Sequence, residues 1–376
     1  MDLLIHRDDL IRALTRVQGI VEKRSTSPIL SAVLVQAQAD GIRLVATDKA
    51  MIFFGDFAAT VRTPGEIAVD AANFFQCARV LSNDVVSIKV VEGQRMEVRC
   101  GSSFFKLNGY PAADFPVTPP LDQSRMLQIE APDLRRLIDQ TLFSVAPDDN
   151  RYGLNGAHIE EVAGAEKPMV RFVSTDGNRL SWSQAPYTGD LAIARKMLLP
   201  RKALAEIRKL LESVEGPVEI AFGERAALVR FSPEGGAGWM MHLRLLEADF
   251  PDYRQVLPSA FKRKVLVERD AFVEALRRVS VFAADSSHSV RFAFGADGLV
   301  LTARKLDAGD SREELAIEFN GEPITMGFNA RFVQEVLGVM GPGRVIAELG
   351  DTLSPCILRA QEDDGAMFVI MPVRLD

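Results

Sequence analysis

The sequence contains few of the residues that build disulfide frameworks, metal sites and catalytic centres. Its 376 residues include three cysteines, four histidines and two tryptophans. Cys77, Cys100 and Cys356 never form a CxxC pair, which argues against a disulfide framework and against a zinc site. The histidines show no metal-ligand spacing. We therefore expect buried free thiols, isolated histidines and no bound metal.

Motifs of the common nucleotide-binding and hydrolytic enzymes are also missing. The chain has no GxGxxG fingerprint, no P-loop, no GxSxG elbow and no HExxH helix. Thr47-Asp48 and Thr175-Asp176 end two equivalent predicted strands, and an Asp at such a place could act as a catalytic carboxylate. More often, a Thr-Asp pair there caps a turn through hydrogen bonds from side chain to backbone. The sequence predicts neither an enzyme nor a cofactor.

Long hydrophobic runs and a basic net charge are absent as well. No charge-free apolar run reaches the roughly 18 residues of a membrane span, and the N-terminus lacks a signal-peptide pattern. We therefore expect a cytoplasmic protein without a membrane partner. Hydrophobic residues at 47% and charged residues at 25% are ordinary for a globular protein. The net charge of −7 argues against nucleic-acid binding unless the charge is unevenly distributed.

What the sequence does contain is an amphipathic helix pattern that occurs three times. It begins as IHRDDLIRALTRV over 5–17 and returns from Ile129 and from Val267, each time with apolar residues on one stripe of a 3.6-residue period. The stripes are Leu10, Leu14, Val17 and Val21, then Leu134, Ile138, Leu142 and Val145, then Phe272, Leu276 and Val279.

A second helix pattern follows each copy. Its stripes are Phe74, Ala78 and Leu81, then Leu204, Ile207 and Leu211, then Phe332, Val336 and Met340. The copies lie much further apart than the roughly 20–50 residues of a solenoid repeat. We therefore predict three duplicated domains, at residues 1–121, 122–258 and 259–376.

Between the helices the hydrophobic period changes to two. Ile42, Leu44 and Ala46 alternate in the first copy, Val170 and Phe172 in the second, with comparable runs elsewhere. Each domain is therefore predicted to be α+β, with two helices packed on one face of a largely antiparallel sheet. Counting Lys and Arg against Asp and Glu, the helical blocks are less acidic than the rest of the chain. Basic side chains that merely solvate exposed helix faces would give the same bias.

The order of several short motifs resembles the family of bacterial sliding clamps, the beta subunits of DNA polymerase III. The motifs are SPIL (27–30), ATD (46–48), PAADFP (111–116), RYGLNG (151–156), STDGNRL (174–180), LPRKAL (199–204), FPDYRQVLP (250–258) and MPVRL (371–375). The resemblance covers essentially the whole chain. It implies a head-to-tail homodimer whose domains close into a ring with helices lining the hole.

The function implied by this resemblance is that of a processivity factor. Such a clamp encircles duplex DNA without sequence specificity and is a non-catalytic subunit of the polymerase holoenzyme. A lumen less acidic than the rim would let phosphates pass without holding them tightly. The partners implied are double-stranded DNA, a second copy of the chain, the alpha subunit of DNA polymerase III, a separate clamp loader, and other polymerases and repair proteins that carry clamp-binding peptides.

The resemblance also implies a partner-peptide cleft between the second and third domains. The matching positions are Arg151, Leu154, Thr175, Gly177, Asn178, Arg179, Leu180, Pro251, Val256, Leu353, Pro355, Met371, Pro372, Val373, Arg374 and Leu375. Aliphatic and Met walls suit the Leu and Phe side chains of an extended peptide, while Arg groups and exposed backbone suit its polar atoms. Taken alone, MPVRL could simply be a last strand. Gly153 departs from the family pattern, in which a second aromatic residue follows Tyr152.

Two further sets of residues follow from the same resemblance. The DNA-contacting positions are Arg24, Arg79, Tyr152, Arg201 and Lys202, and the ring-closing positions are Phe105, Leu107, Val281 and Phe282. Arg95 and Arg99 facing Asp310, Glu313 and Glu314 would give the closure complementary charge. A role of the ring-closing residues within their own domain cores stays open.

Two other functional classes also stay open. An enzyme would need a convergent polar site, which the sequence does not reveal. A clamp-like interaction scaffold, or a specialised second clamp copy, would keep the peptide cleft but encircle DNA weakly.

Overall fold

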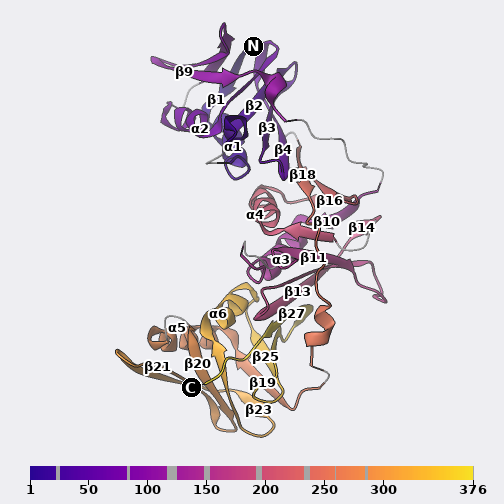
Figure 1. Cartoon of the computed structure of the whole chain (residues 1–376), viewed down its shortest axis with the longest axis vertical. Coiled ribbons are helices and arrows are strands. Elements are labelled where there is room, and N and C mark those ends of the chain that lie inside the picture. The colour runs from indigo at the N-terminus through magenta and orange to yellow at the C-terminus, as the bar shows by residue number, and fades with distance from the viewer. Residues whose placement is uncertain are drawn as a thin grey trace. The chain divides into compact units, whose positions relative to one another are not determined.

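The computed structural model describes residues 1–22, 26–82, 85–116, 125–147, 153–191, 197–232, 238–258, 260–283 and 287–375. The chain forms two compact units, many of whose helices and strands are labelled in Figure 1. Unit 1 consists of Met1–Leu134, Tyr187–Arg195 and Lys202–Leu245, and unit 2 of Arg135–Pro186, Lys196–Arg201 and Leu246–Asp376. The central third of the chain thus contributes to both units. Among the described residues, no helix is both long and apolar enough to cross a membrane.

Unit 1 is built on one 14-stranded sheet in which neighbouring strands are antiparallel. Its order is β14 (Thr188–Gly189), β10 (Leu127–Glu130), β16 (Pro217–Phe222), β17 (Ala226–Phe231), β18 (Trp239–Arg244), β4 (Met51–Phe57), β3 (Gly41–Thr47), β2 (Ala32–Gln38), β6 (Gly65–Asp70), β9 (Ser103–Tyr110), β8 (Arg95–Cys100), β7 (Val85–Val91), β1 (Asp2–His6) and β5 (Thr60–Thr63). The pairing of β18 with β4 makes the sheet continuous between segments that are far apart in the sequence.

The helices of unit 1 form where the apolar stripes predict them. They are α1 (Arg7–Val17), α2 (Ala71–Val80) and, apart from its first residue, α4 (Arg201–Leu210). In α1, Asp8 and Asp9 occupy the first turn and Arg16 the last, which suits the helix dipole. The stripes are buried, as Leu10 and Leu14 are in α1 and Phe74 and Ala78 in α2. The helices therefore cover the sheet with the sides that the sequence predicts.

The start of each first helix differs from the sequence expectation. The pattern predicts a helix from Ile5, but Ile5 and His6 end strand β1, and α1 begins at Arg7. The corresponding blocks likewise begin with the strands β10 and β19 (Arg263–Glu268). Pairing of β1 with β5 on one side and β7 on the other satisfies its backbone and fixes it as a strand. The repeated block is thus a strand followed by a helix.

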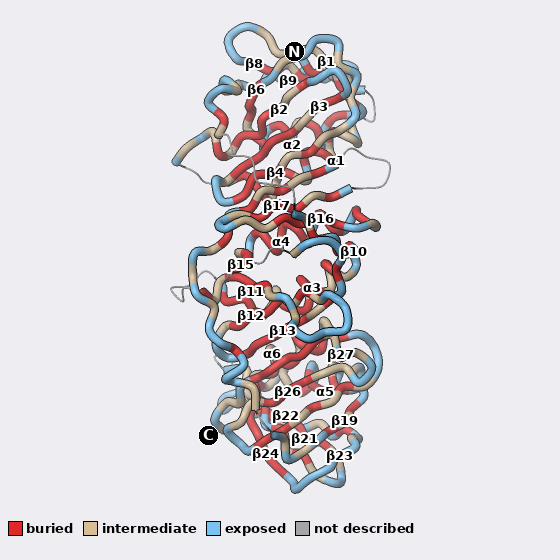
Figure 2. The backbone as a smooth tube through the Cα atoms, turned by 90° about the vertical axis from the view of Figure 1, so that its right-hand side faces the viewer, coloured by how far each residue is buried: buried red, intermediate tan, exposed pale blue. Residues whose placement is uncertain are grey.

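Unit 2 contains two antiparallel sheets, here named the wide sheet and the small sheet. The wide sheet has the order β15 (Met197–Pro200), β11 (Gly156–Glu161), β12 (Met169–Thr175), β13 (Arg179–Pro186), β27 (Asp363–Ile370), β26 (Cys356–Ala360), β25 (Arg344–Leu349), β19 and β23 (Glu318–Asn320). The small sheet has the order β22 (Gly309–Leu315), β21 (Gly298–Lys305), β20 (Ser289–Gly295) and β24 (Ile324–Asn329). In both sheets the buried positions lie along the strands (Figure 2).

Three α-helices belong wholly or mainly to unit 2. They are α3 (Ala131–Leu142), whose first residues lie in unit 1, α5 (Arg269–Val279) and α6 (Ala330–Val339). The Asn329 side chain caps α6 by accepting hydrogen bonds from the backbone N–H groups of Arg331 and Phe332. The chain also forms the short 3₁₀ helices η1 (Pro28–Ser31), η2 (Ala112–Asp114), η3 (Leu211–Ser213), η4 (Tyr253–Val256) and η5 (Ser280–Phe282).

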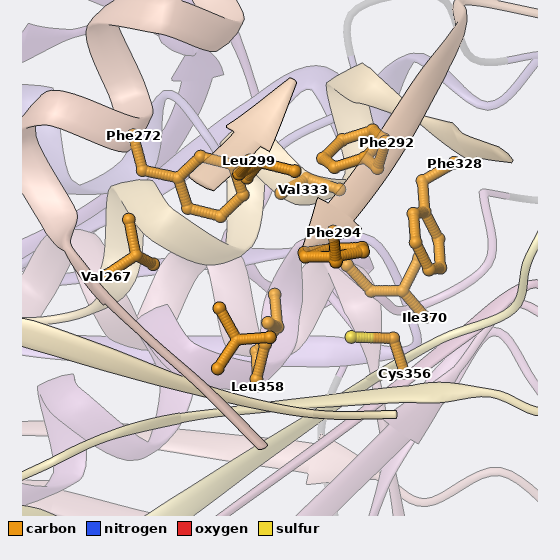
Figure 3. A pocket seen from close by; sticks show the side chains of 12 residues that line it. Val267, Phe272, Phe292, Phe294, Leu299, Phe328, Val333, Cys356, Leu358 and Ile370 are labelled. Carbon is orange, nitrogen blue, oxygen red and sulfur yellow. The ribbon is translucent and has the colours of Figure 1, made fainter. Parts of the chain in front are cut away.

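The core of the last third of the chain lies between the wide sheet, the small sheet and the helices α5 and α6. The Phe292 ring meets the Phe328 ring edge-on, at 5.2 Å between centroids. Phe272, Phe294 and Leu358 are among the side chains that line a cavity of about 20 Å³ (Figure 3). Burial beside this cavity raises the pKa of the Cys356 thiol, which stays protonated. The cavity is lined by apolar groups and offers no polar partner for a ligand.

Helix α6 buries Val336 and, at its C-terminal cap, Met340 of the predicted stripe, but it buries Phe332 only in part. Its buried residues include Val333, Val336 and Leu337, whereas the Phe332 ring is only half-buried. The Arg179 guanidinium lies over the Phe332 ring at 4.3 Å from its centroid. Phe332 therefore faces a cation at the side of the core, which the hydrophobic period alone could not predict.

Candidate functional site

The register of the wide sheet gathers selected residues on one of its faces. Thr175 pairs with Leu180, Leu180 with Val369, and Val369 with Ile357. The next row along the strands contains His158, Val173, Trp182 and Met367, and the row after it Glu160, Arg171 and Gln184. Because side chains alternate along a strand, these rows share one face. Leu180, Val369 and Ile357 are almost fully buried there.

The same register brings four connections to one end of the wide sheet. Leu154 precedes β11, Gly177 and Asn178 join β12 to β13, Pro355 precedes β26, and Met371 follows β27. Arg179, the first residue of β13, pairs with Ile370, the last of β27, and Cys356 also pairs with Ile370. The Met371 N–H donates to the Asn178 carbonyl oxygen at 2.9 Å. We name Leu154, Gly177, Asn178, Leu353, Pro355 and residues 371–375 the end surface.

A tight turn capped by Asp176 shapes part of the end surface, and unit 1 contains an equivalent turn. The Asp176 carboxylate accepts hydrogen bonds from the Asn178 N–H at 2.9 Å and the Arg179 N–H at 3.1 Å. The Thr175 hydroxyl donates to the Arg179 carbonyl oxygen at 2.6 Å. Asp48 caps the equivalent turn in unit 1 by accepting from the Ala50 and Met51 N–H groups at 2.9 and 2.7 Å. Both carboxylates thus serve as turn caps, the more common of the two roles that the sequence allows.

Exposed apolar side chains distinguish the end surface. Leu353 is 76% exposed and Met371 38% exposed, and Val256 on η4 is 46% exposed. Leu353 projects from a turn in which Asp351 accepts hydrogen bonds from the Leu353 and Ser354 N–H groups. The Ser354 hydroxyl, the strongest influence, and these N–H groups lower the pKa of Asp351. The rigid turn therefore holds a large apolar side chain in solvent.

The C-terminal residues are tied to the small sheet. The Val373 N–H donates to the Gly327 carbonyl oxygen at 2.8 Å, and the two residues form an isolated β-bridge. A side chain at Gly327 would clash, since a Cβ there would lie 2.6 Å from the Val373 oxygen. Pro372 and Leu375 are half-buried, and Arg374 is exposed. MPVRL is thus a short bridged segment after β27 and not a full strand.

Residues 250–257 lie over the same face of the wide sheet. Phe250 stacks on the His158 ring with 5.3 Å between centroids, and Tyr253 is 4% exposed within the apolar cluster of Leu180 and Trp182. Pro251 and Val256 remain exposed on this segment. They lie on the segment that covers the sheet face from which Leu180 projects.

Gly153, three residues before β11, lies close to Asp249, which leads into residues 250–257. Its φ of +91° favours glycine, and a Cβ added to it would lie 2.4 Å from the Asp249 carbonyl oxygen. A larger residue could not approach so closely. Gly153, the position that departs from the family pattern, is therefore where two backbone segments meet. One segment continues to Leu154, and the other runs from Asp249 to Pro251.

The Arg179 side chain lies on the opposite face of the wide sheet from Leu180. Its Nε donates to Asp176 at 3.0 Å, one Nη contacts Glu335 and the other donates to the Phe143 carbonyl oxygen at 2.5 Å. The guanidinium also lies over the rings of Phe143 and Phe332. Arg179 thus joins the end of α3 to α6 on the helix-covered face. Although Arg179 was predicted to line the peptide cleft, its side chain points away from the sheet face that carries Leu180.

Of the predicted DNA-contacting residues, Arg24 and Tyr152 lie outside the described residues, as does Arg151 of the predicted cleft. Arg79 is exposed in the last turn of α2. The Lys202 ammonium donates to Asp48 at 2.5 Å and to the Ile20 carbonyl oxygen at 3.4 Å. Arg201 donates to the Val145 carbonyl oxygen at 2.7 Å. Arg201 and Lys202 are therefore both engaged with the protein itself.

The predicted ring-closing residues lie on or beside sheet edges. Phe105 and Leu107 are half-buried on β9, which pairs with β8 from Ser103 to Asn108 and with β6 only at Gly109 and Tyr110. Val281 is 71% exposed on η5. Phe282 packs near Gly309, the first residue of β22, which is an edge strand of the small sheet.

The charges predicted for the ring closure lie on β8, the neighbour of β9, and on the edge strand β22. Arg95 and Arg99 lie on β8, and Asp310, Glu313 and Glu314 on β22. Arg99 donates to Glu97 at 3.1 Å, and Glu313 accepts two hydrogen bonds from Arg278 at 2.9 and 2.8 Å. Hydrogen bonding to Arg278 lowers the pKa of the Glu313 carboxyl. The Glu313 carboxylate on the β22 edge is therefore ionised at neutral pH.

Sequence reasoning did not select Glu160, Arg171 and Tyr253, which form a compact polar cluster beneath residues 250–257. The Tyr253 hydroxyl donates to Glu160 at 2.6 Å, and Arg171 donates to the Tyr253 oxygen at 3.1 Å. Glu160 and Arg171 stand directly opposite each other on β11 and β12. The only sequence signal was a charged residue in each of two strands, and the pairing becomes visible only with the register.

Comparison with known proteins gives matches along the whole chain. Family models described as the N-terminal, central and C-terminal domains of the DNA polymerase III beta subunit match residues 1–119, 128–252 and 254–374. The beta sliding clamp of Caulobacter vibrioides strain NA1000 is 33% identical over 377 residues, which cover 100% of both chains. The beta sliding clamp of Pseudomonas putida is 33% identical over 380 residues, again with 100% of both chains covered.

Solved structures agree with the sequence comparison. A crystal structure of the C. crescentus beta sliding clamp matches with a TM-score of 0.93 and 32% identity over 100% of both chains. A sliding clamp from Pseudomonas aeruginosa bound to griselimycin matches with a TM-score of 0.91 and 32% identity, also over 100% of both chains.

Proposed function

This chain belongs to the family of DNA polymerase III beta subunits, the bacterial sliding clamps, and on that basis we propose that it is a DNA sliding clamp. A sliding clamp is a non-catalytic processivity factor with DNA, a polymerase and a second copy of itself as partners. The single observation that carries this proposal is the match of all three domain models in order along the chain. The domains are proposed to span residues 1–121, 122–258 and 259–376.

Ring closure is proposed to join the β9 edge of one chain to the β22 edge of its partner, head to tail. Each edge offers backbone groups that a neighbouring strand can pair, and an exposed edge otherwise invites uncontrolled association. Arg95 and Arg99 on β8 and the carboxylates on β22 supply opposite charges. Complementary charges steer association and fix the register of the interface.

The end surface and residues 250–257 are proposed to bind the peptides of partner proteins. Leu353, Met371 and Val256 are exposed apolar side chains that can receive the Leu and Phe side chains of an extended peptide. The proposed users are the polymerase alpha subunit, the clamp loader, and other polymerases and repair proteins with clamp-binding peptides. Since these partners share one peptide mode, they would compete for the surface.

We expect Leu353→Asp to weaken peptide binding without unfolding the chain. Leu353 is 76% exposed, so the folded state loses little packing, whereas a bound peptide would desolvate the new carboxylate. The dissociation constant of a fluorescent Gln-x-x-Leu-Phe peptide should rise about tenfold or more, measured by anisotropy. Leu306→Asp is the matched control, because Leu306 is 88% exposed on the turn between β21 and β22. Equal affinities for Leu353→Asp and the parent chain would remove Leu353 from the site.

DNA is proposed to run through the hole of the ring, past the helices that line it. We propose that this takes place in the cytoplasm, where the chromosome is replicated. The proposed contacts are Arg24, Arg79, Tyr152, Arg201 and Lys202. The pairing of Lys202 with Asp48 and of Arg201 with the Val145 carbonyl oxygen favours weak, non-specific contact. The same pairing supports a second candidate, an interaction scaffold or specialised second clamp that keeps the peptide surface and encircles DNA weakly. Retention on circular DNA separates the two.

A further inference from the structure

We propose that Glu160 is a positioning residue for the binding of partner peptides. It holds η4 in place, and with η4 the exposed Val256 side chain that a peptide would contact. The proposal rests on the peptide-binding role of the end surface. The Glu160 side chain is 15% exposed and projects from the face of the wide sheet toward η4. It is therefore placed to act through η4 and not by touching a peptide.

Both oxygens of the Glu160 carboxylate bind side chains of η4. The Tyr253 hydroxyl donates to Oε1 at 2.6 Å, and Arg254 donates from Nη2 to Oε2 at 2.8 Å. Hydrogen bonds to an ionised acceptor are shorter and stronger than those between neutral groups. One half-buried carboxylate thus binds the side chains of the first two residues of the 3₁₀ helix.

Arg171 anchors the cluster to the strands below. It donates to the Tyr253 oxygen at 3.1 Å and approaches Glu160 Oε1 at 3.5 Å. Its other end donates to the Gln184 side-chain oxygen at 2.6 Å, and its guanidinium lies 4.3 Å from the centre of the Trp182 ring. Since β11, β12 and β13 supply these groups, the carboxylate is held by the sheet and cannot follow η4 if that helix shifts.

The geometry of η4 transmits this anchoring to Val256. Side chains three residues apart lie in line along a 3₁₀ helix, so Tyr253 and Val256 point from the same side of η4. The Asp252 side chain caps η4 by accepting from the Arg254 N–H at 3.2 Å. On the N-terminal side, Phe250 stacks on His158. A segment held at Phe250, Tyr253 and Arg254 leaves Pro251 and Val256 as fixed walls.

A double-mutant cycle tests the proposal, with Glu160→Gln, Val256→Ala and the combined variant. Glu160→Gln keeps the shape and removes the charge, and it should weaken binding of a fluorescent Gln-x-x-Leu-Phe peptide about tenfold, the equivalent of one charge-assisted hydrogen bond. Residues that act through one another are non-additive. Once Val256 is shortened, Glu160→Gln should therefore weaken binding by less than about threefold.

The controls separate positioning from stability and from the proposed function. Glu161→Gln makes the same change on the neighbouring, exposed residue of β11 and should leave affinity unchanged. Tyr253→Phe removes only the hydroxyl that donates to Glu160. If Glu160→Gln destabilises the folded chain too strongly for a binding measurement, the affinity of Tyr253→Phe tests the positioning role instead. Additive effects in the cycle, or unchanged affinity in both Glu160→Gln and Tyr253→Phe, would overturn the proposal. If the parent chain itself failed to bind the peptide, the peptide-binding role would fail and this inference with it.

Discussion

Val281→Asp is expected to turn the dimer into folded monomers. Val281 is 71% exposed in the isolated chain, next to η5 residue Phe282 and the β22 edge, so the change removes little intrachain packing. In a closed ring the new carboxylate would be buried against an apolar surface without a partner, which costs several kcal/mol. The dimer dissociation constant should rise at least about a hundredfold. Light scattering and sedimentation over a concentration series give the measurement.

Val80→Asp is the matched control for this prediction. Val80 is 68% exposed at the end of α2, and it lies outside the proposed ring-closing residues. The control should remain dimeric and keep the circular dichroism spectrum of the parent chain. A dimer of undiminished strength in Val281→Asp would show that η5 is not part of the interface.

Arg179→Met is expected to destabilise the folded chain strongly. Arg179 is 8% exposed and bonds to Asp176, Glu335 and the Phe143 carbonyl oxygen, with its guanidinium over the rings of Phe143 and Phe332. Removing one partner of a buried ion pair leaves the other charge poorly solvated. The free energy of unfolding should fall by about 3 kcal/mol, measured by urea denaturation.

Arg331→Met provides the comparison, because Arg331 also pairs with Glu335, at 3.1 Å, but its side chain is 67% exposed. Exposed ion pairs contribute little, so this variant should lose less than about 1 kcal/mol. Both variants replace an arginine by methionine, and the two arginines differ in how far they are buried. Similar losses for both would mean that Arg179 does not join α3 to α6 energetically.

The secondary structure could be predicted largely from hydrophobic period. The period of 3.6 places Leu10, Leu14 and Val17 on the buried stripe of α1, and the period of two places Ile42 and Leu44 within β3. The short strands before the first helices were missed, although Ile5 lies five residues before Leu10 and so off the helical stripe. A strand this short is hard to distinguish from the start of a helix by hydrophobic period. What decides between them is the pairing of β1 with β5 and β7, which is non-local.

Identifying the candidate site required both the family resemblance and the register of the wide sheet. The resemblance selected Leu154, Asn178, Pro355 and Met371, and only the pairing of β13 with β27 and β26 explains why they meet at one end of a sheet. Alternation along β13 would have placed Arg179 and Leu180 on opposite faces from the sequence alone. The Glu160 cluster could not be predicted, because it needs the cross-strand pairing of β11 with β12 and the path of residues 250–257.

As a sliding clamp, this chain is expected to hold to DNA by topology. The most direct measurement loads the protein onto nicked circular plasmid with the cognate clamp loader and ATP, isolates the complex by gel filtration, and repeats the filtration after the plasmid is cut. We predict that the protein travels with the circle and is lost from the linear DNA. Retention by topology is contradicted if the protein never stays on the circle, although it is dimeric and its loader is active on a control clamp.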